Sequence, residues 1–120
     1  MAHSPEFESL CIEAKGRIGE ITLETLLADR GEYLLVDVRE DREWEGGHMP
    51  GAIHLGKGVL ERDLVAAVPD KQTRIVLYCG GGFRSALAAE SIQRMGYTQV
   101  WSLVGGIKGW WRHEQDAGTD

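Results

Sequence analysis

Residues 79 to 85 bring together a thiol, three consecutive glycines and a guanidinium group: Cys79, Gly80, Gly81, Gly82, Phe83, Arg84 and Ser85. Glycine reaches backbone conformations that other residues resist, so successive N–H groups in such a loop can turn inward and hold an anion. A cysteine facing this concavity, with Arg84 at its far end, is expected to favour the thiolate and to act as a nucleophile. The alternative is a flexible glycine turn beside an ordinary buried cysteine.

The segments on either side predict where this cysteine lies in the fold. Residues Arg74 to Tyr78 form an apolar run typical of a strand buried on both faces of a parallel sheet. Residues Ser85 to Met95 are strong helix formers, and Gly96 is placed to end the helix. Cys79 is therefore expected between the carboxyl end of a strand and the amino end of a helix, where ligands and anions bind in α/β sheets.

A second buried strand is expected from Tyr33 to Arg39, and its last residues become polar. Alternation along a strand places Asp37 and Arg39 on the same side at its carboxyl end. In a parallel sheet, that end lies at the same edge as Cys79. We therefore expect Asp37 and Arg39 to brace the cysteine loop.

The rest of the chain alternates between helical and strand-like segments. Helices are expected over residues 5–15, 23–29, 40–45, 59–68 and 107–113, and strands over 18–21, after the Pro-Gly turn at 50–51, and over 99–103. Thr22 is expected to cap the second helix and Gly31 to close it. This order predicts one α/β domain with a doubly wound, mostly parallel sheet of about five strands flanked by helices.

The composition is typical of an ordinary globular protein and restricts the partners. The 120 residues carry a net charge of -6, which argues against nucleic acid or an anionic membrane as a partner. We expect no signal peptide and no membrane-spanning segment. The two cysteines, Cys11 and Cys79, lie far apart in unlike settings, which argues against a structural disulfide. A reducing compartment, and so a cytoplasmic location, is expected.

Three further groups of residues receive structural interpretations. Cys11 is expected to be a core residue, because it shares an apolar helical stripe with Phe7, Leu10 and Ala14. His48 and His54 flank the Pro-Gly turn without the spacing of metal ligands, so we expect hydrogen-bonding roles and no metal site. Of the adjacent residues Trp110 and Trp111, at least one is expected to be exposed.

Four motifs in one order carry a resemblance to a known family. They are Asp37-Val38-Arg39-Glu40, Gly47-His48-Met49-Pro50-Gly51-Ala52, Cys79-Gly80-Gly81-Gly82-Phe83-Arg84-Ser85-Ala86, and Gly96-Tyr97 with Leu103-Val104-Gly105-Gly106-Ile107. Together they resemble a single-domain rhodanese, a member of the rhodanese-like sulfurtransferases. The resemblance implies a rhodanese-like domain over residues 17–113, preceded by an N-terminal helical extension at 1–16 and followed by a flexible tail at 114–120.

The resemblance implies a sulfurtransferase without a cofactor. Cys79 would carry the sulfur as a persulfide, and the backbone amides from Gly80 to Ser85 would form the cradle that binds the substrate. Arg84 would be an electrostatic partner, and Asp37 and Arg39 would be supporting residues. The donor would be thiosulfate, a polysulfide or a low-molecular-weight persulfide. The acceptor would be a thiol or cyanide, and a protein persulfide acceptor is a further candidate partner.

Two other classes of function share some of these features. Cysteine phosphatases and arsenate reductases use a similar cradle, but with a loop one residue longer than the four residues that separate Cys79 from Arg84. A non-catalytic sensory module or a persulfide carrier is the third possibility.

Within the rhodanese resemblance, Glu43 follows the Asp-x-Arg strand where some two-domain relatives place a cation, which argues against efficient use of thiosulfate. The loop also differs from the type associated with mercaptopyruvate.

Overall fold

The computed structural model describes residues 3–117 as alternating helices and strands. The elements in chain order are α1 (Pro5–Lys15), β1 (Gly19–Ile21), α2 (Leu23–Ala28), a 3₁₀ turn η1 (Arg30–Glu32), β2 (Leu34–Asp37), α3 (Asp41–Glu45), β3 (Ile53–His54), α4 (Leu60–Ala67), β4 (Ile75–Tyr78), α5 (Arg84–Arg94), β5 (Val100–Leu103) and α6 (Gly106–Ala117). Every predicted helix and strand in this range is present, with ends shifted by a few residues.

The five strands form one parallel sheet in the order β1-β5-β4-β2-β3. The predicted doubly wound parallel sheet is therefore confirmed, with β1 as an edge strand. Asp37 at the end of β2 pairs with Tyr78 at the end of β4. The two strands thus end side by side, and Cys79 follows directly beside Val38.

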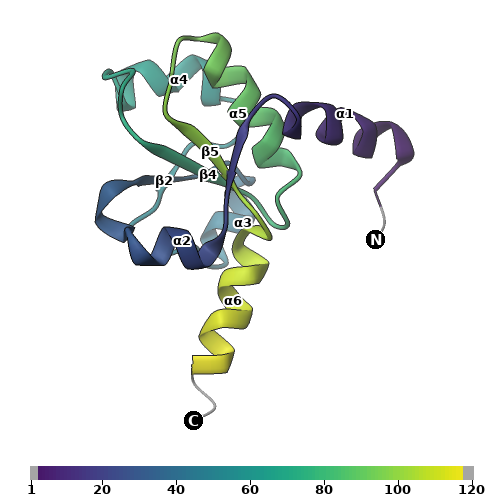
Figure 1. The fold of residues 1–120 in the computed structure, drawn as a ribbon, viewed down its shortest axis with the longest axis vertical. Helices are drawn as coiled ribbons and strands as arrows, with labels where there is room; N and C mark the ends of the chain where they lie inside the picture. Colours follow the sequence, from purple (N-terminus) through teal and green to yellow (C-terminus); the bar gives the residue numbers. More distant parts are fainter. Residues whose placement is uncertain (1–2, 118–120) are drawn as a thin grey trace.

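Helices cover both faces of the sheet, which explains why β4 is apolar at every position. Ile75 and Leu77 face a core that includes α4 and α5, whereas Val76 and Tyr78 face a core that includes α2 and α6. Figure 1 shows these two helix pairs on opposite sides of the sheet. All four residues of β4 are buried, as expected for a central parallel strand.

Local signals set most of the helix boundaries. Thr22 Oγ1 accepts a hydrogen bond from the backbone N–H of Thr25 at 3.2 Å, so the predicted cap of α2 is confirmed. Gly96 has a φ of 103° directly after the C-cap of α5. The prediction that Gly31 closes α2 is wrong, because α2 ends at Ala28 and Gly31 lies inside η1. The chain tightens into a 3₁₀ turn there instead of reversing at a glycine.

The two terminal helices extend away from the sheet (Figure 1). α1 packs against α5 and buries Cys11 and Ala14, in agreement with the predicted core position of Cys11. Leu10 does not belong to that buried stripe, since 56% of it is exposed. α6 continues to Ala117, so residues 114–117 of the predicted tail are helical, and 118–120 lie outside the described residues. Among the described helices, none has the length and apolar character needed to cross a membrane.

Candidate active site at the Cys79 loop

Cys79 lies at the end of β4, and its sulfur is enclosed by the loop that follows. The backbone N–H groups of Gly82 and Ser85 donate hydrogen bonds to Cys79 Sγ at 3.2 and 3.4 Å. The Ser85 hydroxyl lies 3.5 Å from Sγ and 2.7 Å from the hydroxyl of Ser102. Two backbone N–H groups thus point at a single sulfur, which is the arrangement that stabilises negative charge on it, while the Cys79 thiol itself donates to the Ser85 hydroxyl.

The first turn of α6 holds the other side of the cysteine loop. Ile107 N–H donates to the carbonyl of Cys79 at 2.9 Å, and Lys108 N–H donates to the carbonyl of Gly80 at 3.1 Å. Gly106 must be a glycine at this contact, since a Cβ there would lie 2.5 Å from the Cys79 carbonyl oxygen, and its φ is 55°. The carbonyls of the cysteine loop therefore point at α6, and the N–H groups of the same loop remain free to point at the sulfur.

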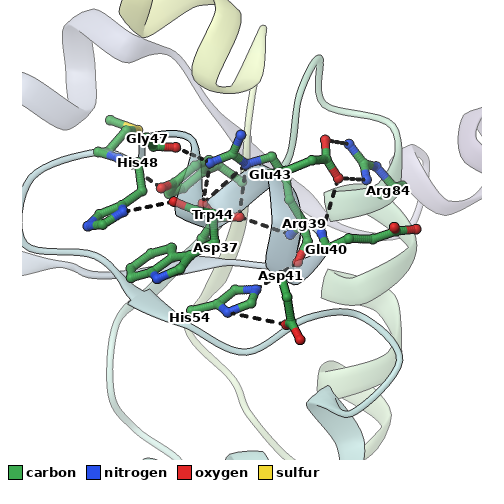
Figure 2. Close-up of polar contacts among 12 residues, drawn as sticks. Asp37, Arg39, Glu40, Asp41, Glu43, Trp44, Gly47, His48, His54 and Arg84 are labelled. Carbon is green, nitrogen blue, oxygen red and sulfur yellow. Dashed lines mark hydrogen bonds and ion pairs between the residues drawn. The ribbon is translucent and has the colours of Figure 1, made fainter.

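Arg84, the predicted electrostatic partner of Cys79, forms a two-point ion pair with Glu43 of α3. Its Nη1 and Nη2 donate to the two carboxylate oxygens of Glu43 at 2.7 and 3.0 Å (Figure 2). The guanidinium of Arg84 lowers the pKa of Glu43 to about 2, so Glu43 is ionised at neutral pH. Sequence reasoning noted Glu43 only as a departure from relatives. Its position three residues after Glu40, in a capping box that opens α3, was the available signal.

Asp37 and Arg39 form a buried ion pair at the end of β2. Arg39 Nη2 donates to Asp37 Oδ2 at 2.8 Å and to the carbonyl of Gly47 at 2.7 Å (Figure 2). Asp37 is fully buried and only 3% of Arg39 is exposed. The side-chain hydrogen bonds of this pair lead to Gly47, in the segment after α3, and among the described residues none of them reaches the cysteine loop. Bracing of that loop by Asp37 and Arg39 therefore stays a prediction.

Aromatic stacking also holds α3 and the segment that follows it. The ring of Trp44 stacks on His48, with centroids 3.5 Å apart, and on His54, with centroids 5.0 Å apart (Figure 2). A ring nitrogen of His54 lies 2.8 Å from the carbonyl oxygen of Arg39. Both histidines make hydrogen bonds to backbone carbonyls, in agreement with the structural roles expected for them.

A cavity of about 460 Å³ opens in front of Cys79. Besides Cys79, its lining residues are His3, Phe7, Glu43, Gly80, Gly81, Phe83, Arg84 and Lys108. The sequence predicted the loop residues of this lining but missed His3, Phe7, Glu43 and Lys108. Gly82 and Ser85 of the loop are buried and reach the sulfur through their N–H groups. Trp111 is 45% exposed, as predicted for one residue of its pair, and does not line this cavity.

Comparison with known proteins agrees with this geometry. The family model for the Rhodanese-like domain matches residues 22–113. A sulfurtransferase from Allochromatium vinosum is 35% identical over 99 residues, covering 80% of this chain and 91% of that protein. The thiosulfate sulfurtransferase GlpE from Coxiella burnetii is 30% identical over 87 residues, covering 72% of this chain and 79% of GlpE.

The solved structures also include a protein of similar size. A protein of unknown function from Rhodopseudomonas palustris, described as a possible tyrosine phosphatase, superposes with a TM-score of 0.76 at 28% identity and covers 98% of this chain and 95% of its own. Some curated relatives are longer, since the chain spans between 27% and 70% of the first four matched.

Proposed function

The chain belongs to the rhodanese-like domain family, and we propose that it is a sulfurtransferase that carries sulfane sulfur as a persulfide on Cys79. The observation that carries the proposal is the enclosure of Cys79 Sγ by the N–H groups of Gly82 and Ser85 at 3.2 and 3.4 Å. The match with this chain spans 79% and 91% of the length of two relatives that are named sulfurtransferases. The catalytic residue is Cys79, and the loop from Gly80 to Ser85 binds the sulfur that is transferred.

The first half of the reaction loads the cysteine. The Cys79 thiolate attacks the outer sulfur of the donor, a new Sγ–S bond forms, and the donor's S–S bond breaks with its electron pair leaving on the remaining fragment. With thiosulfate that fragment is sulfite, and with an organic persulfide it is a thiolate. The inward N–H groups stabilise the charge that collects on the transferred sulfur, as preorganised donors stabilise an oxyanion.

The second half of the reaction unloads the cysteine. An acceptor thiolate or cyanide attacks the outer sulfur of the Cys79 persulfide, and Cys79 leaves as the thiolate in which it began. Because donor and acceptor use the same sulfur in turn, the kinetics should be ping-pong. A protein thiol that enters the same cavity would make this domain a persulfide carrier, which is the same chemistry with a larger acceptor.

Phosphatase activity is the competing function, because a structural relative is described as a possible tyrosine phosphatase. Two observations favour sulfur transfer. Only four residues separate Cys79 from Arg84, which suits one sulfur atom better than a phosphoryl group. The Arg84 guanidinium, which a phosphatase would direct at the phosphoryl oxygens, is occupied by the Glu43 carboxylate.

The test is intact-protein mass spectrometry after incubation of reduced protein with thiosulfate, polysulfide or an organic persulfide. We expect the gain of one sulfur atom that cyanide removes, that Cys79→Ser abolishes and that Cys11→Ser leaves unchanged. Cys11 is a suitable control because it is a buried free cysteine on α1. If no donor adds sulfur to Cys79, while the protein hydrolyses an aryl phosphate, the proposal fails and the phosphatase function takes its place.

A further inference from the structure

The helix α1 lies outside the family match, yet it forms part of the wall around Cys79. The match begins at residue 22 and α1 ends at Lys15. His3 and Phe7 nevertheless line the same cavity as Cys79. The N-terminal extension is therefore placed where it can contact whatever binds at the reactive sulfur.

His3 and Phe7 form an aromatic cluster with Phe83 of the cysteine loop, and we call these three residues the aromatic wall. The ring centroid of His3 lies 4.9 Å from that of Phe7 and 4.8 Å from that of Phe83, and the two phenylalanine rings are 6.4 Å apart. These spacings are those of interacting aromatic pairs. Phe7 and Phe83 are only half-buried, so the wall presents apolar surface to the cavity.

Several contacts hold the aromatic wall in place. The Ser4 hydroxyl accepts a hydrogen bond from Phe7 N–H at 3.1 Å, which caps α1 and turns His3 back toward the loop. Cys11 is fully buried between α1 and the domain, and Arg17 forms an ion pair with Glu90 of α5 at 2.8 Å. Figure 1 shows α1 beside α5 along this contact. The wall is thus a fixed part of the fold and not a loose terminus.

The charges around the cavity suit a monoanion better than a dianion. Arg84 and Glu43 neutralise one another through their two-point ion pair. Lys108 adds one positive charge to the lining, which the Cys79 thiolate would balance, and Lys15 Nζ lies 4.6 Å from the centroid of the Phe83 ring. One cation beside the aromatic wall thus remains for the donor. An organic persulfide carries at most one negative charge, whereas thiosulfate carries two and would bring the second close to the Glu43 carboxylate. The cavity volume of about 460 Å³ lies within the range of small-molecule sites, about 300–1,000 Å³.

We propose that the preferred sulfur donor is a low-molecular-weight organic persulfide whose hydrocarbon group binds against the aromatic wall. This inference rests on the proposed sulfurtransferase function and names its donor class. The Cys79 thiolate attacks the outer sulfur of R–S–SH, and the Sγ–S bond forms as the donor's S–S bond breaks. The electron pair stays on the inner sulfur, which takes the proton of the outer sulfur and leaves as R–SH. No oxidant or reductant is required.

The experiment compares benzyl persulfide with methyl persulfide, both generated in situ, as donors to Cys79. The rate of sulfur gain is followed by rapid quenching and intact mass. In the wild type we expect benzyl persulfide to react about tenfold faster at limiting concentration, the selectivity that one aromatic contact and its burial can supply. Phe7→Ala should reduce this benzyl-to-methyl ratio to about two or less. His3→Ala should lower it in the same direction, which keeps the test informative if Phe7→Ala folds poorly.

Ile12→Ala is the matched control, because Ile12 is an apolar residue of the same helix that is 65% exposed and does not line the cavity. It should leave both rates and their ratio unchanged. Equal reaction of both persulfides with the wild type, or an unchanged ratio in both Phe7→Ala and His3→Ala, would overturn the inference. Loading of Cys79 by thiosulfate or polysulfide in that case would leave the sulfurtransferase function intact. Failure of every donor would instead remove the function itself.

Discussion

The ends of β2 and β4 lie side by side at one edge of the sheet but use their polar groups in opposite ways. At the end of β2, Asp37 and Arg39 satisfy each other in a buried ion pair. At the end of β4, the N–H groups of the following loop point at the sulfur of Cys79. The β2 end is closed, because its charges have partners within the fold. The β4 end is left open to a reactant, because its N–H donors point at a sulfur beside a cavity.

Glu43 and Arg84 connect the two ends. Glu43 belongs to the segment that follows β2, and Arg84 belongs to the helix that follows the cysteine loop. Their ion pair is partly exposed, unlike that of Asp37 and Arg39. From this difference we expect buried charge at this edge to support the structure and exposed charge to set the electrostatic character of the site. The predictions below test this division, beginning with the largest effect.

The open end depends on one atom, so Cys79→Ser should abolish persulfide formation completely. The serine hydroxyl can accept the same N–H hydrogen bonds, so the fold should be retained. Sulfur transfer to cyanide and the thermal unfolding temperature are the two measurements. Removal of a catalytic nucleophile lowers the rate about 10⁶-fold in the best-studied case, so residual transfer above about one thousandth of the wild-type rate would mean that another group carries the sulfur.

A substitution at the closed end should lower the free energy of unfolding and leave sulfur transfer by the folded protein unchanged. Asp37→Asn leaves the Arg39 guanidinium buried without its counter-charge, and breaking a buried pair in this way costs about 3–5 kcal/mol. Urea unfolding should show this loss. Asp63→Asn is the matched control, since it removes the partner of Arg62 in an exposed, solvent-screened pair and should leave the free energy of unfolding nearly unchanged. Equal costs for the two substitutions would contradict the division between closed and open ends.

The pattern of residues near each strand end explains what the sequence could predict. The β4 strand, the glycine loop and α5 follow one another along the chain, so their composition alone placed Cys79 between strand and helix. The alternation Asp37-x-Arg39 likewise predicted a shared side of β2. These inferences succeeded because each depends on neighbouring residues, whose geometry the backbone period fixes.

The missed residues depend on how distant segments dock. Glu43 and Arg84 are 41 positions apart, and their pairing follows from the orientation of α3 relative to α5. His3 and Phe7 reach the cavity because Cys11 and Ala14 bury one face of α1 beneath the domain. The apolar spacing predicted the buried positions of Cys11 and Ala14 but not the width of the covered face, and for that reason Leu10 was wrongly placed in the buried stripe.

The connecting pair should control the choice of donor charge. Glu43→Gln removes the negative charge beside Arg84, so kcat/KM for thiosulfate should rise about tenfold at low salt, and the gain should shrink as ionic strength increases. The exposed Glu45 lies on the same helix, and Glu45→Gln makes the same change in net charge. It should alter thiosulfate use by less than about twofold. A similar gain in both variants would show that overall charge, not the Arg84 pair, governs the donor.

The same pair should have a small effect on stability that depends on pH. Because Arg84 lowers the pKa of Glu43 from 4.5 to about 2, the ionised carboxylate stabilises the folded state above pH 4.5, and this contribution is lost as the pH falls toward 2. The pair is partly exposed, so the free energy of unfolding should differ between wild type and Glu43→Gln by at most about 1 kcal/mol at pH 7. Urea unfolding of both proteins at pH 7, 5 and 2.5 isolates the effect of Glu43, since the other carboxyl groups titrate in both. A difference that persists undiminished at pH 2.5 would show that shape and hydrogen bonding, and not charge, join the two strand ends.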